Sequence, residues 1–258
     1  MKRRRDVNAR GWQRDDAARW IYGVNAVERR LVAQPHTVRE VRMVPALGGR
    51  RPRLSGAAEA AGIPVREADA STLERLTGSL EHQGVAALVP VFAYADIEAI
   101  LATDTGPLLV LDQVQDPNNL GALIRTAASV GMAAVVIPRH GAARVTAAVE
   151  KVAAGAVVDV PICQVANLHR LLLGLQRVGC WSIALTPRGG QSLFSIDLPF
   201  RPVLVLGGET GLRPLVEGTC DLQASIPQRR GVESLNASVA GAIAMYEVCR
   251  RLQRLDTL

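Results

Sequence analysis

This chain of 258 residues lacks the long apolar runs that mark membrane proteins. No segment reaches the roughly 18 consecutive apolar residues that a transmembrane helix requires. The basic stretch from Met1 to Arg5 is followed by further charged residues instead of the apolar core of a secretory signal. We therefore expect a soluble, cytoplasmic protein with no membrane partner.

Cysteine is also scarce, and its spacing excludes two kinds of cross-linked fold. The four cysteines are Cys163, Cys180, Cys220 and Cys249, and no two of them form a C-x-x-C pair. Neither a disulfide framework nor a structural zinc site fits this pattern. We expect four reduced, mostly buried thiols and no bound metal.

Several nucleotide-binding and catalytic motifs are missing as well. None of the 23 glycines belongs to a G-x-G triplet, so the dinucleotide-binding fingerprint is absent. The chain also contains no phosphate-binding loop of the form G-x-x-x-x-G-K-[ST], no G-x-S-x-G and no H-E-x-x-H. A nucleotide-like ligand would have to be held in another way.

The positive charge is concentrated at the start of the chain. Residues 1 to 20 carry seven basic and three acidic side chains, and residues 21 to 90 carry nine arginines and seven acidic side chains. The remainder has fourteen of each sign. A basic arm over residues 1–18 would attract a polyanion such as RNA, because each neutralised phosphate releases counterions. The alternative is a solvated tail with no partner.

Residues 19–91 have the pattern of a small α/β unit. Tyr22-Gly23-Val24-Asn25 precedes an apolar-periodic stretch, which predicts a helix capped by Asn25. Further strands are predicted at 38–44, 63–65 and 85–91, and helices up to Ala61 and at 70–76.

Residues 92–106 have the composition of a linker with one short helix, and residues 107–258 alternate between strands and helices. Strands are predicted at 108–112, 134–137, 181–186, 203–206 and 222–226, and helices at 119–130, 145–154, 167–178, 212–218 and 235–253. This order indicates a mainly parallel sheet covered on both faces, with ligands at the carboxyl ends of its strands.

Three polar segments follow predicted strands and precede helices. They are Leu111 to Ala127, which contains Asp116, Asn119 and Arg125; Val205 to Leu212; and Ile226 to Ser238. Each has a structural explanation when it is considered alone. Asp116-Pro117-Asn118 is a good turn and cap, the Gly207-Gly208-Glu209-Thr210-Gly211 segment is a common kind of turn, and Ser234-Leu235-Asn236 is a plausible cap.

In this order and spacing, the three segments resemble the motifs of the SpoU/TrmH branch of the knotted SPOUT methyltransferases, over about residues 107 to 250. Upstream, Tyr22-Gly23-Val24-Asn25-Ala26-Val27 and His82-Gln83-Gly84-Val85 are similar to landmarks of the small ribosomal-protein-like (L30e-like) RNA-binding domain carried by the large-subunit guanosine methyltransferases of that family.

The resemblance implies an α/β methyltransferase domain with a C-terminal trefoil knot, and a homodimer that binds S-adenosylmethionine and methylates a ribose 2'-hydroxyl. The implied substrate is 23S rRNA or a large-subunit precursor. The implied reaction site consists of Asn119, Arg125, Glu209, Ser234 and Asn236. The implied cofactor contacts are Thr186, Gly207, Ile226 and Leu235.

Arg125 is the residue whose implied role needs most care. A guanidinium stays protonated in proteins and is a poor base. We therefore expect Arg125 to orient a phosphate and to stabilise the developing alkoxide, while the proton passes to phosphate or solvent.

Two departures from the family pattern lie near the expected cofactor loops. The Gly207 to Gly211 loop is one residue shorter than is usual, and Arg230 occupies the place of a glycine that here follows as Gly231. Because Glu209, Ser234, Leu235 and Asn236 are retained, we expect an active enzyme with weakened cofactor affinity.

Three alternatives stay open at this point. The RNA target could be a transfer RNA or another ribosomal site, the chain could be a catalytically inactive RNA-binding relative, or it could be an unrelated nucleotide-binding α/β protein. The C-terminal helix carries an apolar stripe that implies burial on two sides and supports the dimer. The stripe consists of Leu235, Val239, Ala242, Ile243 and Tyr246, widened by Met245, Val248 and Leu252.

Overall fold

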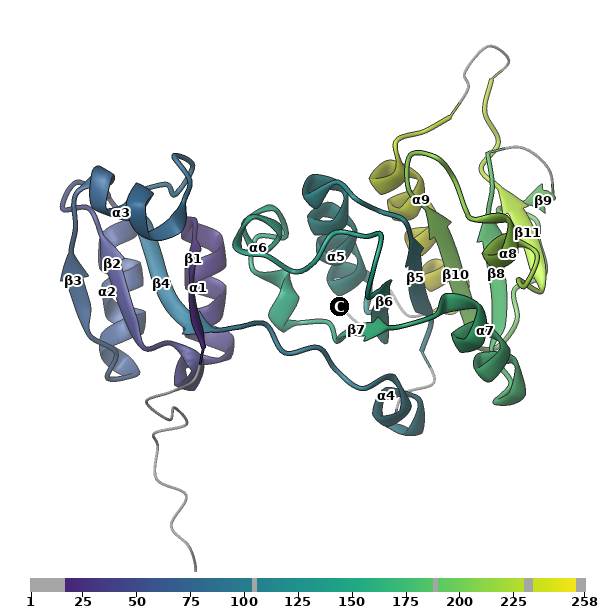
Figure 1. Cartoon of the computed structure of the whole chain (residues 1–258), viewed down its shortest axis with the longest axis horizontal. Helices are drawn as coiled ribbons and strands as arrows, with labels where there is room; N and C mark the ends of the chain where they lie inside the picture. Colours follow the sequence, from purple (N-terminus) through teal and green to yellow (C-terminus); the bar gives the residue numbers. More distant parts are fainter. Residues whose placement is uncertain (1–16, 104–105, 188–189, 230–233, 254–258) are drawn as a thin grey trace, which may run out of the picture. The chain divides into compact units, whose positions relative to one another are not determined.

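The computed structural model describes residues 17–103, 106–187, 190–229 and 234–253, which form two compact units (Figure 1). The first holds the described residues up to Phe92 together with Thr146–Val158, and the second holds Ala93–Val145 and the described residues from Asp159 onward. The segment 146–158 thus clusters with the small unit, although it lies inside the stretch that the sequence pattern assigns to the methyltransferase domain. The domain bounds drawn from the sequence stay a prediction.

The first unit is built on a four-stranded sheet in the order β1-β4-β2-β3. Its strands are β1 (Ala18–Tyr22), β2 (Glu40–Met43), β3 (Val65–Glu67) and β4 (Val85–Pro90). Its helices are α1 (Val24–Ala33), the 3-10 turn η1 (Pro35–Thr37), α2 (Arg50–Ala60) and α3 (Ala70–Thr77). Side chains alternate along the strands, so Ile21 packs in the core with α1 and α2, while Tyr22 packs with Leu73 of α3.

The start of α1 differs from the prediction. The N-cap is Gly23, with a φ of 92°, and Asn25 lies inside the helix, so the cap assigned to Asn25 was wrong. The side-chain oxygen of Gln83 accepts a hydrogen bond from Val24 N at 2.9 Å, which satisfies one of the free amides of the first turn. A residue 59 positions away in sequence thus replaces the expected local cap.

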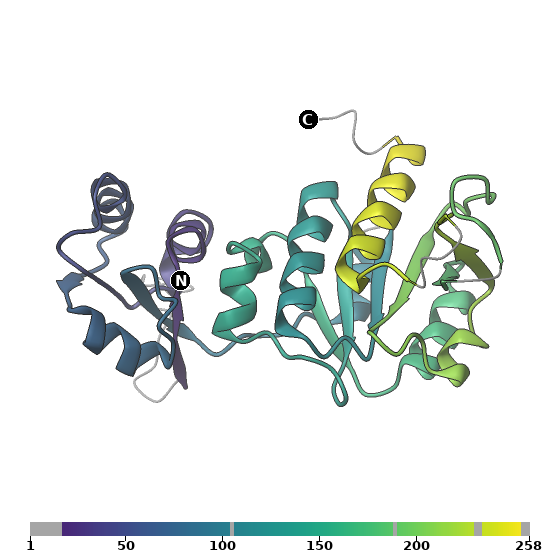
Figure 2. The same ribbon diagram turned by 90° about the horizontal axis from the view of Figure 1, so that it is seen from above.

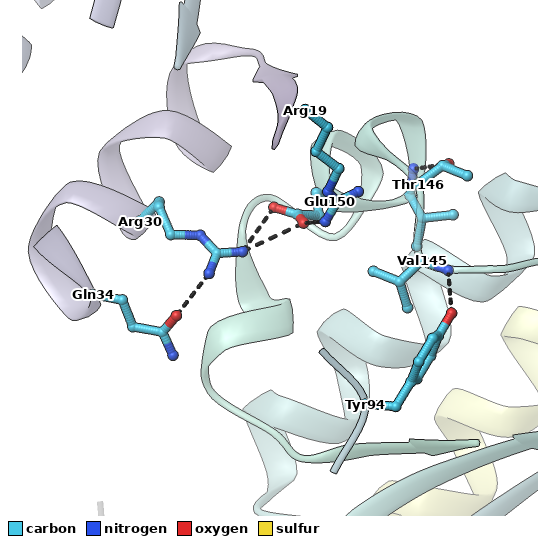
Figure 3. Close-up of polar contacts among 8 residues, drawn as sticks. Arg19, Arg30, Gln34, Tyr94, Val145, Thr146 and Glu150 are labelled. Carbon is cyan, nitrogen blue, oxygen red and sulfur yellow. Dashed lines mark hydrogen bonds and ion pairs between the residues drawn. The ribbon is translucent and has the colours of Figure 1, made fainter. Parts of the chain in front are cut away.

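The segment with α6 (Ala147–Val152) and the 3-10 turn η2 (Ala156–Val158) packs against β1, the edge strand of this sheet. Glu150 is 1% exposed and pairs with Arg19 of β1 and Arg30 of α1 (Figure 3). Arg30 Nη2 lies 3.2 Å from Glu150 Oε2, and Arg30 Nη1 donates to Gln34 Oε1 at 2.6 Å. Covering the edge strand in this way blocks its pairing with other chains.

The second unit contains a seven-stranded sheet in the order β7-β6-β5-β10-β8-β11-β9, in which every neighbouring pair is parallel. The strands are β5 (Leu108–Asp112), β6 (Ala134–Pro138), β7 (Ile162–Val165), β8 (Trp181–Leu185), β9 (Gln191–Ser192), β10 (Pro202–Gly207) and β11 (Leu222–Ser225). The mainly parallel α/β fold expected from the sequence is confirmed. The trefoil knot stays a prediction.

Helices cover both faces of this sheet (Figure 2). Helices α5 (Pro117–Val130) and α9 (Ala237–Arg251) pack together on one face, and α7 (Leu168–Arg177) and α8 (Pro214–Glu217) lie on the other, with α4 (Ile97–Thr103) in the segment before β5. Gly241 permits the close packing of α9, because a Cβ there would lie 2.3 Å from Leu123 Cδ2 of α5.

Cys163, Cys180 and Cys249 are buried and Cys220 is half-buried, in agreement with the expectation of mostly buried thiols. Burial raises the pKa of the Cys163 thiol to about 11 and that of Cys220 to about 12, so both are protonated near neutral pH. Among the described helices, none combines the length and apolar character needed to cross a bilayer.

Candidate functional site

The carboxyl ends of three adjacent strands of the second unit form a pocket of about 230 Å³ together with the first turn of α9. The strands are β8, β10 and β11, as the parallel order predicts. The lining residues are Leu185, Thr186, Pro187, Leu206, Gly207, Gly208, Glu209, Gly211, Ile226, Gln228, Ser234, Leu235, Asn236, Ala237 and Ala240. We call this the first pocket.

A second pocket of about 300 Å³ lies at the end of β5 and the start of α5. Its lining residues are Gln113, Val114, Gln115, Asp116, Asn119, Gly208, Glu209 and Thr210. Gly208 and Glu209 line both pockets, so the two adjoin at this turn. The charged side chains among the described lining residues are Glu209 and Asp116, which makes the paired site acidic.

The turn between the pockets depends on its glycines. Gly208 N donates to Asp112 O at 2.8 Å, and a Cβ on Gly208 would lie 2.1 Å from Gln113 O. Gly211, with a φ of 82°, donates its N–H to Gly208 O at 3.0 Å. The shortened loop therefore closes as a tight turn and still presents Glu209 to both pockets.

Asp112 fixes the far end of this turn. Its fully buried carboxylate accepts hydrogen bonds from Arg213 N and Arg213 Nε, both at 2.9 Å, and Arg213 Nη2 lies 2.8 Å from Oδ1. A carboxylate at the end of β5 thus holds the chain that follows Glu209. The sequence pattern does not predict this pair, although Asp112 stands at the carboxyl end of a strand, where polar groups gather.

The structure gathers most of the predicted site residues. Thr186, Gly207, Ile226, Leu235, Glu209, Ser234 and Asn236 line the first pocket, and Asn119, which is 6% exposed, lines the second. Arg125 is exposed on α5 and lines neither pocket. Arg230 and Gly231, on which a departure from the family pattern rests, lie outside the described residues.

Two residues that line the pockets, Asn236 and Asp116, also cap helices. The side-chain oxygen of Asn236 caps α9 by accepting from Ser238 N at 2.8 Å and Val239 N at 3.4 Å. Asp116 caps α5 by accepting from Asn118 N at 2.9 Å. Both caps agree with the structural explanations drawn from the sequence.

Gln228 lines the first pocket and was not among the predicted site residues. Its Oε1 and the Oγ1 of Thr186 are buried and have no hydrogen-bond partner among the described residues. Both belong to the first pocket. Gln228 lies within the third polar segment, so its position carried a signal, but its lack of a partner depends on the folded structure.

Two family models match the chain. The SpoU rRNA Methylase family matches residues 106–246, and the RNA 2'-O ribose methyltransferase substrate binding domain matches residues 20–95.

Curated relatives match nearly the whole length. The 23S rRNA (guanosine-2'-O-)-methyltransferase RlmB of Xanthomonas axonopodis pv. citri (strain 306) is 42% identical over 241 residues, covering 90% of this chain and 96% of the relative. The protein of the same name from Pseudomonas aeruginosa is 38% identical over 245 residues, covering 92% and 98%.

Solved structures show the same fold. A TrmH-family protein from Porphyromonas gingivalis, described as a putative RNA methyltransferase, has a TM-score of 0.72 at 28% identity and covers 91% of this chain and 90% of its own. The SpoU methyltransferase AviRb from Streptomyces viridochromogenes, solved in complex with AdoMet, has a TM-score of 0.76 at 20% identity and covers 93% and 92%. A structure solved to give insight into the 2-OH methylation of C/U34 on tRNA has a TM-score of 0.52 at 29% identity. The match covers 58% of this chain and 99% of that structure.

Proposed function

Because the chain belongs to the SpoU rRNA methylase family, we propose that it transfers the methyl group of S-adenosylmethionine to the ribose 2'-hydroxyl of a guanosine in 23S rRNA. The observation that carries this proposal is the pair of adjoining pockets that share Glu209. Methyl transfer needs a donor and an acceptor held side by side, and two pockets that meet at one turn supply that arrangement.

The ribosomal substrate is favoured by the extent of the match. The relatives named as 23S rRNA guanosine methyltransferases align with both units of this chain, whereas the structure described by tRNA methylation covers 58% of it. The first unit, matched by a substrate-binding model, is the part that would contact ribosomal RNA or a large-subunit precursor. For such a substrate we propose that the activity is cytoplasmic.

The first pocket fits S-adenosylmethionine on its own chemistry. Thr186 Oγ1 and Gln228 Oε1 are buried polar atoms that need hydrogen-bond partners, and Glu209 favours a cationic ligand such as a sulfonium. At Gly207, a Cβ would lie 2.2 Å from Gly211 C, so the wall of the pocket requires glycine there. Thr186, Gly207, Ile226 and Leu235 would hold the methionine and adenosine parts.

When bound, S-adenosylmethionine supplies an electrophilic methyl group on a positively charged sulfur. Asn119 and Glu209 line the second pocket, where a carboxamide and a carboxylate would orient a ribose hydroxyl for in-line attack. Ser234 and Asn236, beside Glu209 in the first pocket, would complete the polar wall facing the reaction. Among the described residues, no group of three or more potential metal ligands is present, and the reaction as proposed uses no metal.

Arg125 would act from outside both pockets. Its exposed position on α5 suits a contact with the phosphate next to the target ribose, where a permanent positive charge also stabilises the developing alkoxide. The proton would pass to phosphate or solvent. We also propose a homodimer, in which the RNA reaching Arg125 is held partly by the second subunit.

Transfer of labelled methyl groups tests the proposal directly. The protein is incubated with labelled S-adenosylmethionine and either whole ribosomal RNA, transfer RNA or precursor large subunits, and the modified ribose is then mapped. We expect label on one guanosine of 23S rRNA. Label confined to transfer RNA would show that the substrate is a transfer RNA and not 23S rRNA. Absence of label from every RNA, with cofactor binding intact, would favour a catalytically inactive RNA-binding relative.

A further inference from the structure

Two buried polar atoms on residues of the first pocket have no hydrogen-bond partner in the part of the chain that the structure describes. Thr186 follows β8, and Gln228 follows β11, the strand paired with β8 in parallel. Thr186 N donates to Ala224 O at 3.0 Å, so the backbone of Thr186 is satisfied while its hydroxyl is not. Gln228 Oε1 is likewise buried without a partner among the described residues.

Such atoms are uncommon in folded proteins because a buried acceptor without a donor loses its hydrogen bonds to water and gains nothing in return. Here the two residues that carry these atoms line one pocket, and they come from two different loops. Two unpaired polar atoms on two residues that line the same cavity indicate a ligand that provides the missing hydrogen-bond partners. Neither atom is needed to hold its own loop, since neither bonds to the described protein.

The chemistry of the two groups restricts what the ligand must offer. A carboxamide oxygen only accepts, so its partner is a donor, whereas a threonine hydroxyl both donates and accepts. We propose that Gln228 accepts a hydrogen bond from an amino group of S-adenosylmethionine and that the Thr186 hydroxyl makes a second polar contact with the same molecule. This inference rests on the proposed function. These side chains would then set cofactor affinity in addition to the backbone and apolar wall.

The cofactor carries two amino groups that meet this requirement, one on its methionyl arm and one on its adenine. Two analogues separate them. 5'-Methylthioadenosine lacks the methionyl amino group, and S-inosylhomocysteine carries an oxygen in place of the adenine amino group. The substitution at Gln228 should stop mattering for whichever analogue lacks the true partner.

The test uses two substitutions that keep side-chain size and remove the polar atom, Gln228→Met and Thr186→Val. Gln223→Met is the matched control, because Gln223 is exposed on β11 and its side chain bonds to Glu217 outside the first pocket. Calorimetric titration of the full chain with S-adenosylhomocysteine measures affinity without any methyl transfer. Thermal unfolding without ligand measures the structural effect of each substitution.

We expect Gln228→Met and Thr186→Val each to weaken S-adenosylhomocysteine binding by about threefold to tenfold, the loss that follows removal of one hydrogen bond. Without ligand, both variants should melt at the same temperature as the wild type or higher, because each removes an unsatisfied buried group. Gln223→Met should change neither quantity. A residue with a merely structural role would instead lower the melting temperature of the unliganded protein.

Unchanged affinity in both variants, with normal binding by the wild type, would overturn the inference and leave the proposed function standing. A penalty at Gln228 that persists with both analogues would overturn the assignment to an amino group. If the wild type itself binds no S-adenosylhomocysteine, the proposed function fails and this inference fails with it.

Discussion

At the scale of single residues, a substitution of Arg125 tests the proposed separation of cofactor binding from catalysis, because Arg125 lines neither pocket. We predict that Arg125→Ala leaves the affinity for S-adenosylmethionine unchanged and lowers methyl transfer by about 100-fold or more, as loss of transition-state stabilisation does. Single-turnover assays beside calorimetric titration measure the two effects. Arg170→Ala, at an exposed position on α7, is the control. Full activity of Arg125→Ala would refute the role assigned to it.

Arg213 illustrates a residue whose importance is structural and local. Its guanidinium and backbone amide both bond to the buried Asp112 carboxylate. Because the Arg213 side chain is 45% exposed, solvent screens part of the interaction, and we predict that Arg213→Ala lowers the free energy of unfolding by about 2 kcal/mol. Urea denaturation measures this loss. A change no larger than that of Arg170→Ala would contradict the prediction.

The site residues that the sequence could predict are those with a recognisable chemical pattern. Glu209, Ser234 and Asn236 stand in polar turns between a strand and a helix, and such turns converge at one edge of a parallel sheet. Gln228 could not be selected in this way, because its significance is the absence of a partner in the folded chain. The Asp112–Arg213 pair was missed because it joins residues 101 positions apart.

At the scale of elements, α6 is the helix whose packing the sequence did not predict. The predicted helix at 145–154 contains it, but α6 packs on the edge strand of the first unit through Glu150. We predict that Glu150→Ala lowers the free energy of unfolding by about 3 kcal/mol, because it leaves Arg30 buried without its carboxylate. Chemical denaturation followed by tryptophan fluorescence measures this, since Trp20 lies on β1 of this unit.

Glu98→Ala is a suitable control for Glu150, since Glu98 lies in α4 of the second unit and no ion pair involving it is found among the described residues. Equal stability of the two variants would show that the buried pairs of Glu150 contribute nothing.

Three strands were not predicted, because their sequences carry only a weak strand pattern. β1 follows the charged arm and mixes Arg19 with aromatic residues, β7 has four residues after Pro161, and β9 has two. By contrast, β5 was predicted with its observed bounds. Its four apolar residues and the aspartate that ends it are all buried, because both faces of the strand are covered. Burial on both faces of a parallel sheet leaves a continuous apolar run, and short edge strands leave none.

At the scale of the whole molecule, the distribution of charge along the chain predicts which segment contributes to RNA binding. Residues 1 to 16 carry six basic and three acidic side chains, a net charge of +3 out of the +6 of the whole chain. We predict that deleting residues 1–16 weakens affinity for 23S rRNA fragments and flattens the dependence of affinity on salt, because fewer counterions are released. Affinity for S-adenosylmethionine should stay the same. An unchanged salt slope would identify the arm as a tail with no RNA contact.

The proposed homodimer is tested at α9. One face of this helix packs in its own unit through Gly241, Ala244, Met245 and Val248, of which Met245 and Val248 belong to the predicted stripe. The other face leaves Val239 47% and Tyr246 50% exposed, and an apolar stripe of this kind on a helix is a common dimer contact.

We predict that the wild type is a dimer at micromolar concentration and that Tyr246→Asp shifts it toward monomer, because the interface would bury an unpaired carboxylate. Sedimentation equilibrium measures both states. Phe200→Asp, at a side chain that is 82% exposed and lies outside α9, just before β10, should leave the dimer intact. A wild type that is strictly monomeric would show that α9 serves its own unit alone, and the contribution of a second subunit to RNA binding would have to be abandoned.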